Sequence, residues 1–141
     1  MALLGVGWMI GGGQALHSAE IGRVLAFAAF GGSEGVAAPL DLRVRAKTAP
    51  TGSVWVGPGV GAILNRATGG AGELYVERND ADTSVNISAT GGTGRSDLVI
   101  LQVQDPYEAG TGWAIPADPA QGPYAAFDVI SGVNSTMKSV V

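Results

Sequence analysis

Short runs of alternating apolar and polar residues, most of them separated by glycine-rich turns, constrain the fold of this chain more than any other feature. Residues 40–47 alternate Leu, Leu, Val and Ala with Asp, Arg, Arg and Lys. This two-residue period is typical of a strand with one buried face. The chain has 23 glycines in 141 residues, against a usual share of about 7%, and they follow no fixed repeat. Many short strands joined by tight turns predict a mainly β protein.

Further strand-like segments follow at short intervals. Ser53–Val56 precedes the turn Gly57-Pro58-Gly59, and residues 61–64 continue after it. The remaining strands are predicted at residues 73–77, 84–89, 97–103 and 124–130. Residues 97–103 are the most apolar, so we expect them to form the central strand. This pattern predicts an antiparallel β-sandwich-like domain.

One segment, residues 15–30, has a helical period instead. Four of its apolar residues recur at steps of three and four, namely Ile21, Val24, Leu25 and Ala28. These residues share one helix face, and Gly31-Gly32 ends the segment. We therefore predict one N-terminal α-helix that packs on the sheets through this apolar face.

The predicted core draws on all of these elements. Its members are Ile21, Val24, Leu25, Leu42, Val44, Val54, Val56, Ile63, Leu74, Val76, Val85, Ile87, Leu98, Ile100 and Val129. A chain of this length suits one domain, which we place at residues 15–141, behind a docking arm at residues 1–14. Residues 137–141 read as the start of another strand, so we expect the native chain to be longer.

The first ten residues are apolar and include no Lys or Arg. A secretory signal requires a basic region before its apolar run, and a membrane span requires about 20 apolar residues. We therefore expect no membrane insertion and interpret this segment as an interface. The predicted interface residues are Leu3, Leu4, Val6, Trp8 and Ile10, together with Trp113 in the loop of residues 107–123.

Composition excludes several kinds of partner and site. The net charge is −4 and no run of basic residues occurs, so the chain lacks the electrostatic footprint of a nucleic-acid binder. Cysteine is absent, which rules out disulfides, thiolate metal sites and a cysteine nucleophile. Charged residues make up only 14% of the chain, whereas well-solvated surfaces are about 25–35% charged. We expect partners to cover part of the surface.

Two glycine-rich motifs resemble cofactor loops, but their context differs. Gly57–Ala62 follows a strand, as a dinucleotide loop does, yet no full helix follows it. Gly91–Ser96 lacks the Lys of a phosphate loop and precedes a strand; we expect it to close a hairpin between the strands of Val85 and Leu98. Asp80-Ala81-Asp82 has too few ligands for a calcium loop. No cofactor or metal is predicted.

Two roles are compatible with the sequence Arg95-Ser96-Asp97, a catalytic one and a structural one. A nucleophilic serine needs an adjacent base; the only histidine is His17, and the glycines of a nucleophile elbow are missing. A hydrolase built on Ser96 is the alternative here. We favour a structural role, because Arg95 and Asp97 point to the same side of an extended chain and can pair there at a strand end.

A series of motifs carries a resemblance to a known family. They are Gly11–Gln14, His17–Ile21, Arg23–Leu25, Gly32–Val36, Pro39–Val44, Val56–Arg66, Tyr75–Asn79, Gly94–Val99, Asp105–Gly110 and Val129–Gly132. In this order and spacing, and over nearly its whole length, the chain resembles the N-terminal domain of minor tail proteins of phages that infect actinobacteria. Such domains usually continue into further strands and often into a fibre-like region.

The resemblance implies a structural virion protein, not an enzyme, at the tail tip, baseplate or fibre base of a long-tailed phage. It also implies a homo-oligomer, with a trimer favoured, whose partners are other phage tail proteins and whose distal parts reach host surface glycans. Two alternatives are a carbohydrate-binding module that contacts the host envelope, with Trp113 in its site, and a capsid decoration protein.

Overall fold

The computed structural model of this chain describes residues 3–5, 19–49, 51–67, 70–108 and 112–137. The strands are β1 (Leu3–Gly5), β2 (Gly35–Val36), β3 (Val44–Ala46), β4 (Ser53–Val56), β5 (Gly59–Leu64), β6 (Leu74–Asn79), β7 (Thr83–Asn86), β8 (Asp97–Val103) and β9 (Ala125–Ser131), and the helix is α1 (Ala19–Ala29). No helix in these ranges is long and apolar enough to cross a bilayer.

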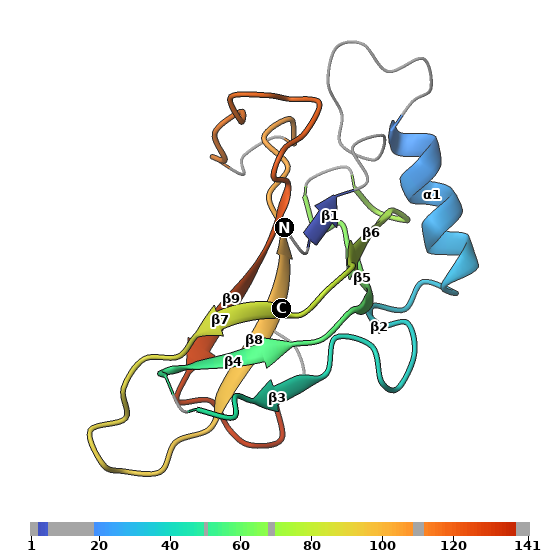
Figure 1. Ribbon diagram of the computed structural model, residues 1–141. Coiled ribbons are helices and arrows are strands. Elements are labelled where there is room, and N and C mark those ends of the chain that lie inside the picture. Colours follow the sequence, from blue (N-terminus) through green and yellow to red (C-terminus); the bar gives the residue numbers. More distant parts are fainter. Residues whose placement is uncertain (1–2, 6–18, 50, 68–69, 109–111, 138–141) are drawn as a thin grey trace.

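The strands form three antiparallel sheets (Figure 1). Sheet order is β1-β6-β5-β2 in the first and β3-β4-β7 in the second, and β8 and β9 form a two-stranded ribbon. The ribbon lies across the other two sheets, with β8 against β5 and β9 against β7 and β1. The predicted class, a mainly β, sandwich-like fold with one helix, is confirmed.

Strand positions follow the sequence pattern closely in the middle of the chain. β4 and β8 have the predicted bounds, whereas β5 begins two residues earlier than expected, at Gly59. Gly59 has φ +151°, and a Cβ there would lie 2.5 Å from the Leu42 backbone nitrogen. Only glycine allows this approach, which also brings the Val60 N–H to the Asp41 carboxylate, at 3.1 Å.

The alternating run at residues 40–47 forms a shorter and more exposed strand than predicted. Leu42 has φ 54°, a left-handed conformation that interrupts an extended chain, so only Val44–Ala46 form β3. Because β3 is an edge strand, Val44 is 48% exposed. Its prediction as a core residue is wrong, although Leu42 is half-buried.

The prediction that residues 97–103 form the central strand is also wrong. Among the described residues β8 pairs with β9 alone, and all seven of its residues are only half-buried. The hairpin predicted between the strands of Val85 and Leu98 does not form, since β7 pairs with β4 instead. The glycine-rich segment between β7 and β8 leads the chain from one sheet to another.

The core within the described residues is small. Val56, Leu74 and Val85 are buried as predicted, and the remaining predicted strand residues, Val54, Ile63, Val76, Ile87, Leu98, Ile100 and Val129, are half-buried. Sequence analysis missed the two tyrosines at the centre: Tyr75 and Tyr124 are buried together, with Ile63 and Val103 packed against them.

The helix packs on the sheet through the face opposite to the predicted one. Ile21 is 61% exposed and Leu25 63% exposed, and Val24 is also exposed. The buried residues of α1 are Ala19, Gly22 and Arg23, and the helix lies alongside β6 (Figure 1). The core prediction for Ile21, Val24 and Leu25 is therefore wrong. Small residues bring the helix backbone close to the sheet, and a charged side chain provides the main contact.

Candidate functional site

A groove of about 1120 Å³ runs along β8. One wall is β8 itself, and the facing wall comes from β5 with the short strands β2 and β3. The lining is largely apolar, with Val36, Leu42, Val44, Val56, Ile63, Val99, Leu101, Val103 and Phe127 contributing to it. A Cβ at Gly61 would come within 2.7 Å of the Leu101 side chain, so glycine at this position lets β8 approach β5 at the floor of the groove.

Charged groups close one end of the groove. Arg66 donates two hydrogen bonds to the Glu34 carboxylate, at 2.8 and 2.7 Å, and this pairing holds the pKa of Glu34 below its usual value. Asn65, Tyr75 and Asp105 line the same end. The groove is thus apolar along its length and polar where it ends.

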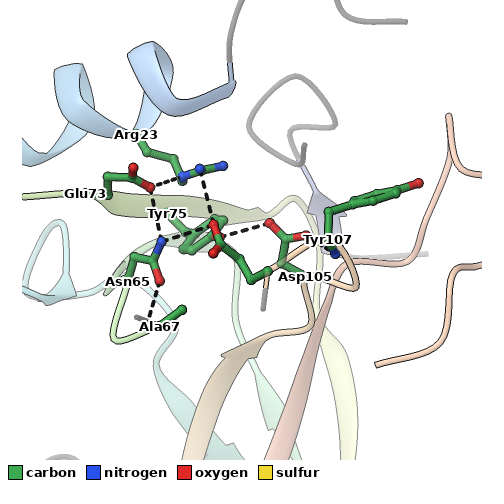
Figure 2. Close-up of polar contacts among 8 residues, drawn as sticks. Arg23, Asn65, Ala67, Glu73, Tyr75, Asp105 and Tyr107 are labelled. Atoms are coloured by element: carbon green, nitrogen blue, oxygen red, sulfur yellow. Dashed lines mark hydrogen bonds and ion pairs between the residues drawn. The ribbon is translucent and has the colours of Figure 1, made fainter. Parts of the chain in front are cut away.

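Behind this polar end, Arg23 of α1 enters a buried network, which Figure 2 shows. Its guanidinium forms an ion pair with Glu73, the residue before β6, and a second one with Glu108 at 3.2 Å. The guanidinium also lies 5.3 Å from the centre of the Tyr75 ring, within range of a cation–π contact. Asn65 donates to Glu73 at 3.1 Å and to Glu108 at 3.3 Å. These contacts join the helix, the sheet and the loop after β8.

The Tyr75 hydroxyl extends the network to that loop. It donates to Asp105 at 2.9 Å and lies 3.3 Å from Glu108, and Asp105 also accepts the Tyr107 N–H at 2.9 Å. Asp105 is buried, so its carboxylate holds the loop against the sheet.

The pKa values of Arg23 and Tyr75 fit this arrangement. Burial alone would lower the pKa of Arg23, but the hydrogen bond and the charge of Glu73 outweigh it, and the pKa lies above its ordinary value. Burial, then the hydrogen bond to Asp105, raises the pKa of the Tyr75 phenol. Arg23 therefore stays charged and Tyr75 stays neutral. The network is a structural joint, and sequence reasoning missed it.

Arg95 and Asp97, the predicted structural pair, lie together at the start of β8. Arg95 donates to both Asp97 oxygens, at 2.7 and 2.9 Å, and to the Ser88 carbonyl at 2.7 Å. Asp97 also accepts the Gly132 N–H at 3.0 Å. These bonds, the one from Arg95 foremost, lower the pKa of Asp97. The pair ties the start of the ribbon to the segment before it and to the residue after β9.

The predicted interface residues are only partly described. Leu3 and Leu4 lie in β1, which pairs with β6 of the same chain opposite Asn79 and Arg78. Val6, Trp8 and Ile10 lie outside the described residues, as does His17, the histidine of the hydrolase alternative. Trp113 is 37% exposed in the loop before β9.

Glu77, in the middle of β6, is a buried carboxyl that the sequence pattern did not reveal. It lies opposite Gly5 of β1 and Gly61 of β5 and is 1% exposed. One of its carboxylate oxygens has no hydrogen-bond partner among the described residues. Burial raises the pKa of Glu77 to about 7.

No protein-family model, curated protein or solved structure matches this chain. The described residues contain no group of three or more His, Asp or Glu side chains that could hold a metal ion. What the groove offers is an apolar channel beside a strand edge, which suits the binding of an extended chain.

Proposed function

We propose that this protein is a structural subunit of a virion, built into the tail tip, baseplate or fibre base of a phage. In this role it assembles with copies of itself and with neighbouring tail proteins, and it supports distal parts that recognise the host. The resemblance described above gives the location and favours a trimer. The arrangement of apolar surface supports the assembly role.

The observation that carries this proposal is the amount of apolar surface left uncovered on two separate elements. On α1, Ile21, Val24 and Leu25 form one exposed face. Along β8, every residue is half-exposed beside the groove. Contiguous apolar surface of this kind marks protein–protein contact sites.

The contacts of the buried polar groups in the described residues fit a structural role better than a catalytic one. Arg23, Glu73, Asp105 and Tyr75 bond to one another, and Asp97 is engaged by Arg95. A catalytic group needs a free face toward substrate. An ester-substrate screen with Ser96→Ala as control tests the hydrolase alternative: turnover that the variant lacks would replace the structural proposal.

The direct test of location is to detect the chain in purified particles and to label it for electron microscopy. The proposal expects label at the distal end of the tail. Label on the head would instead support a capsid decoration protein, and absence of the chain from particles would contradict both.

A deletion of residues 1–13 tests the docking arm. Its described part, β1, covers only three residues of the β6 edge, so we expect the shortened protein to fold and to be missing from particles. Thermal unfolding checks the fold, and mass spectrometry of purified particles checks incorporation. Normal incorporation would show that the arm is not the docking element.

The carbohydrate-binding alternative has one observation in its favour. Trp113 is 37% exposed and Tyr107 is 40% exposed, and both belong to the loop between β8 and β9. Calorimetric titration with actinobacterial wall sugars tests it. Binding that is lost in Trp113→Ala and kept in Ile115→Ala, a change at an exposed neighbour, would establish a sugar site.

A further inference from the structure

The outer edge of β8 carries none of the features that usually protect a strand edge. Within the described residues β8 pairs only with β9. Its sequence, DLVILQV, has no proline, no glycine and a single charged residue, Asp97, and Arg95 already pairs with that charge. Natural edges are blunted by lysine, proline or a bulge, because an open edge can pair with another chain.

The hydrogen bonds to β9 determine which backbone groups of β8 point outward. Gln104 extends the register of the ribbon and donates its N–H to the Tyr124 carbonyl at 2.7 Å. In an antiparallel pair, hydrogen-bonded residues alternate with non-hydrogen-bonded ones. Residues 98, 100 and 102 therefore bond to β9, and residues 97, 99, 101 and 103 direct their N–H and C=O groups to the outer edge.

This outer edge opens into the groove. Five consecutive residues of β8, Val99–Val103, line the groove, whereas β9 contributes only Phe127. Consecutive residues of a strand point to opposite faces, and a groove that follows the edge of β8 brings residues from both faces into its lining. An added strand would cover apolar groups that are now exposed, including Val36 and Val44 on the facing wall.

We propose that β8 of a second copy of this chain adds antiparallel to this edge, in a register centred on Ile100. The register sets Ile100 opposite Ile100 of the second copy, Val99 opposite Leu101, Leu98 opposite Gln102 and Asp97 opposite Val103. The strand is self-complementary in this register, because the central pairs, Ile100 with Ile100 and Val99 with Leu101, are apolar on both sides and no two like charges are opposed. The outward groups of residues 97, 99, 101 and 103 form the new hydrogen bonds, and a two-fold axis passes through the pair.

This inference rests on the proposed structural role and names the surface through which two copies meet. A two-fold contact joins copies in pairs. It produces a dimer, or it joins two trimers if a three-fold contact exists elsewhere. The four strands β9, β8, β8 and β9 then form one continuous sheet across the axis.

Single cysteines test the register, since the chain contains no cysteine of its own. In the proposed pair the two Ile100 residues face each other at a non-hydrogen-bonded site, where Cα atoms are about 4.5 Å apart, a distance that a disulfide accepts. Under a mild thiol oxidant such as diamide, Ile100→Cys should form a disulfide-linked dimer, which a non-reducing gel detects.

Leu98→Cys is the matched control, because residue 98 lies on the same strand and the same face. In this register the two copies of residue 98 are four residues apart along the strands, about 14 Å, too far for a disulfide to close. We expect at least about tenfold less dimer from it, since bridging fails beyond about 7 Å. A mixture of Leu98→Cys and Gln102→Cys proteins should form the cross-linked heterodimer.

Equal cross-linking of Ile100→Cys and Leu98→Cys, or none from Ile100→Cys, would overturn the proposed pairing. The structural role would survive that result if the protein still associated in sedimentation experiments and occurred in particles. Absence from particles would contradict the structural role itself, whatever the cysteines show.

Discussion

At the scale of single residues, Arg23 does more than any other side chain to seat the helix on the sheet. It is buried, and it reaches Glu73 and Glu108 from the only described helix. Removing a charge from water is costly, and the cost is offset only when partners and hydrogen bonds are in place. Here two carboxylates and the face of the Tyr75 ring provide them. The apolar stripe of the helix is thereby left free of the chain's own core.

Replacing Arg23 by methionine should be strongly destabilising. In Arg23→Met the buried Glu73 carboxylate loses its ion pair with Arg23 and the half-buried Glu108 loses one contact, and breaking a buried pair on one side costs about 3–5 kcal/mol. Urea denaturation measures the change in the free energy of unfolding. The double variant Arg23→Met, Glu73→Gln should recover part of the loss, because one uncompensated charge is removed. A single variant as stable as the wild type would show that the network does not hold the helix.

Glu77 gives the stability of the protein a characteristic pH dependence. Burial raises its pKa from 4.5 to about 7 in the folded state. Between these two pH values the folded state therefore holds a proton that the unfolded state has released. The contribution of Glu77 to the free energy of unfolding is therefore largest below about pH 4.5, and it is lost as pH rises to about 7. The expected loss is on the order of 3 kcal/mol, at about 1.4 kcal/mol for each pKa unit.

Glu77→Gln should remove this slope, since the amide does not titrate. Wild type and variant are compared by urea denaturation at pH 5, 6, 7 and 8, and the difference between them isolates Glu77 from Glu34 and Asp97, whose pKa values are lowered. As pH rises, we expect the free energy of unfolding of the variant to increase relative to that of the wild type. Parallel curves over this range would contradict a buried, protonated Glu77.

At the scale of elements, some features of this fold can be predicted from sequence and others cannot. The bounds of β4 follow from its apolar residues and flanking glycines, those of β8 follow from its apolar run, and both are found as expected. Periodicity also identifies the apolar stripe of α1. It does not indicate what covers the stripe, because an apolar face that awaits a partner and one that enters the core have the same pattern.

The buried network around Arg23 shows a second limit of prediction from sequence. Glu73 lies 50 residues from Arg23 along the chain, and neither residue belongs to a motif that predicts their contact. The one signal is the presence of Arg23 within an apolar helix, on the side away from Ile21, Val24 and Leu25. A charge in that position indicates either a solvated face or a buried partner, and only the fold distinguishes the two.

The exposed face of α1 is testable as an element. Leu25→Lys places a charge at a residue that is 63% exposed, so the free energy of unfolding of the isolated protein should change by less than about 0.5 kcal/mol. Incorporation into particles should fall, since the charge would have to be buried at the contact. Ser33→Lys adds the same charge at an exposed polar residue and should leave both unchanged. A loss of about 2–5 kcal/mol for Leu25→Lys would indicate a core position and contradict the exposed face.

At the scale of the whole molecule, the distribution of apolar groups connects the fold with the proposed function. The core is built from few fully buried side chains, and the most apolar strand is half-exposed along its length. The helix presents one apolar face outward, and charged residues make up only 14% of the chain. These features describe a protein completed by its neighbours, in which the groove and the α1 face are the places of contact.

Sedimentation velocity of the purified chain over a wide range of concentrations tests this claim most directly. We expect oligomers whose masses are multiples of 14.1 kDa and whose proportion rises with concentration. A monodisperse 14.1 kDa species at every concentration would contradict it, because the exposed faces would then have no partner among copies of the chain.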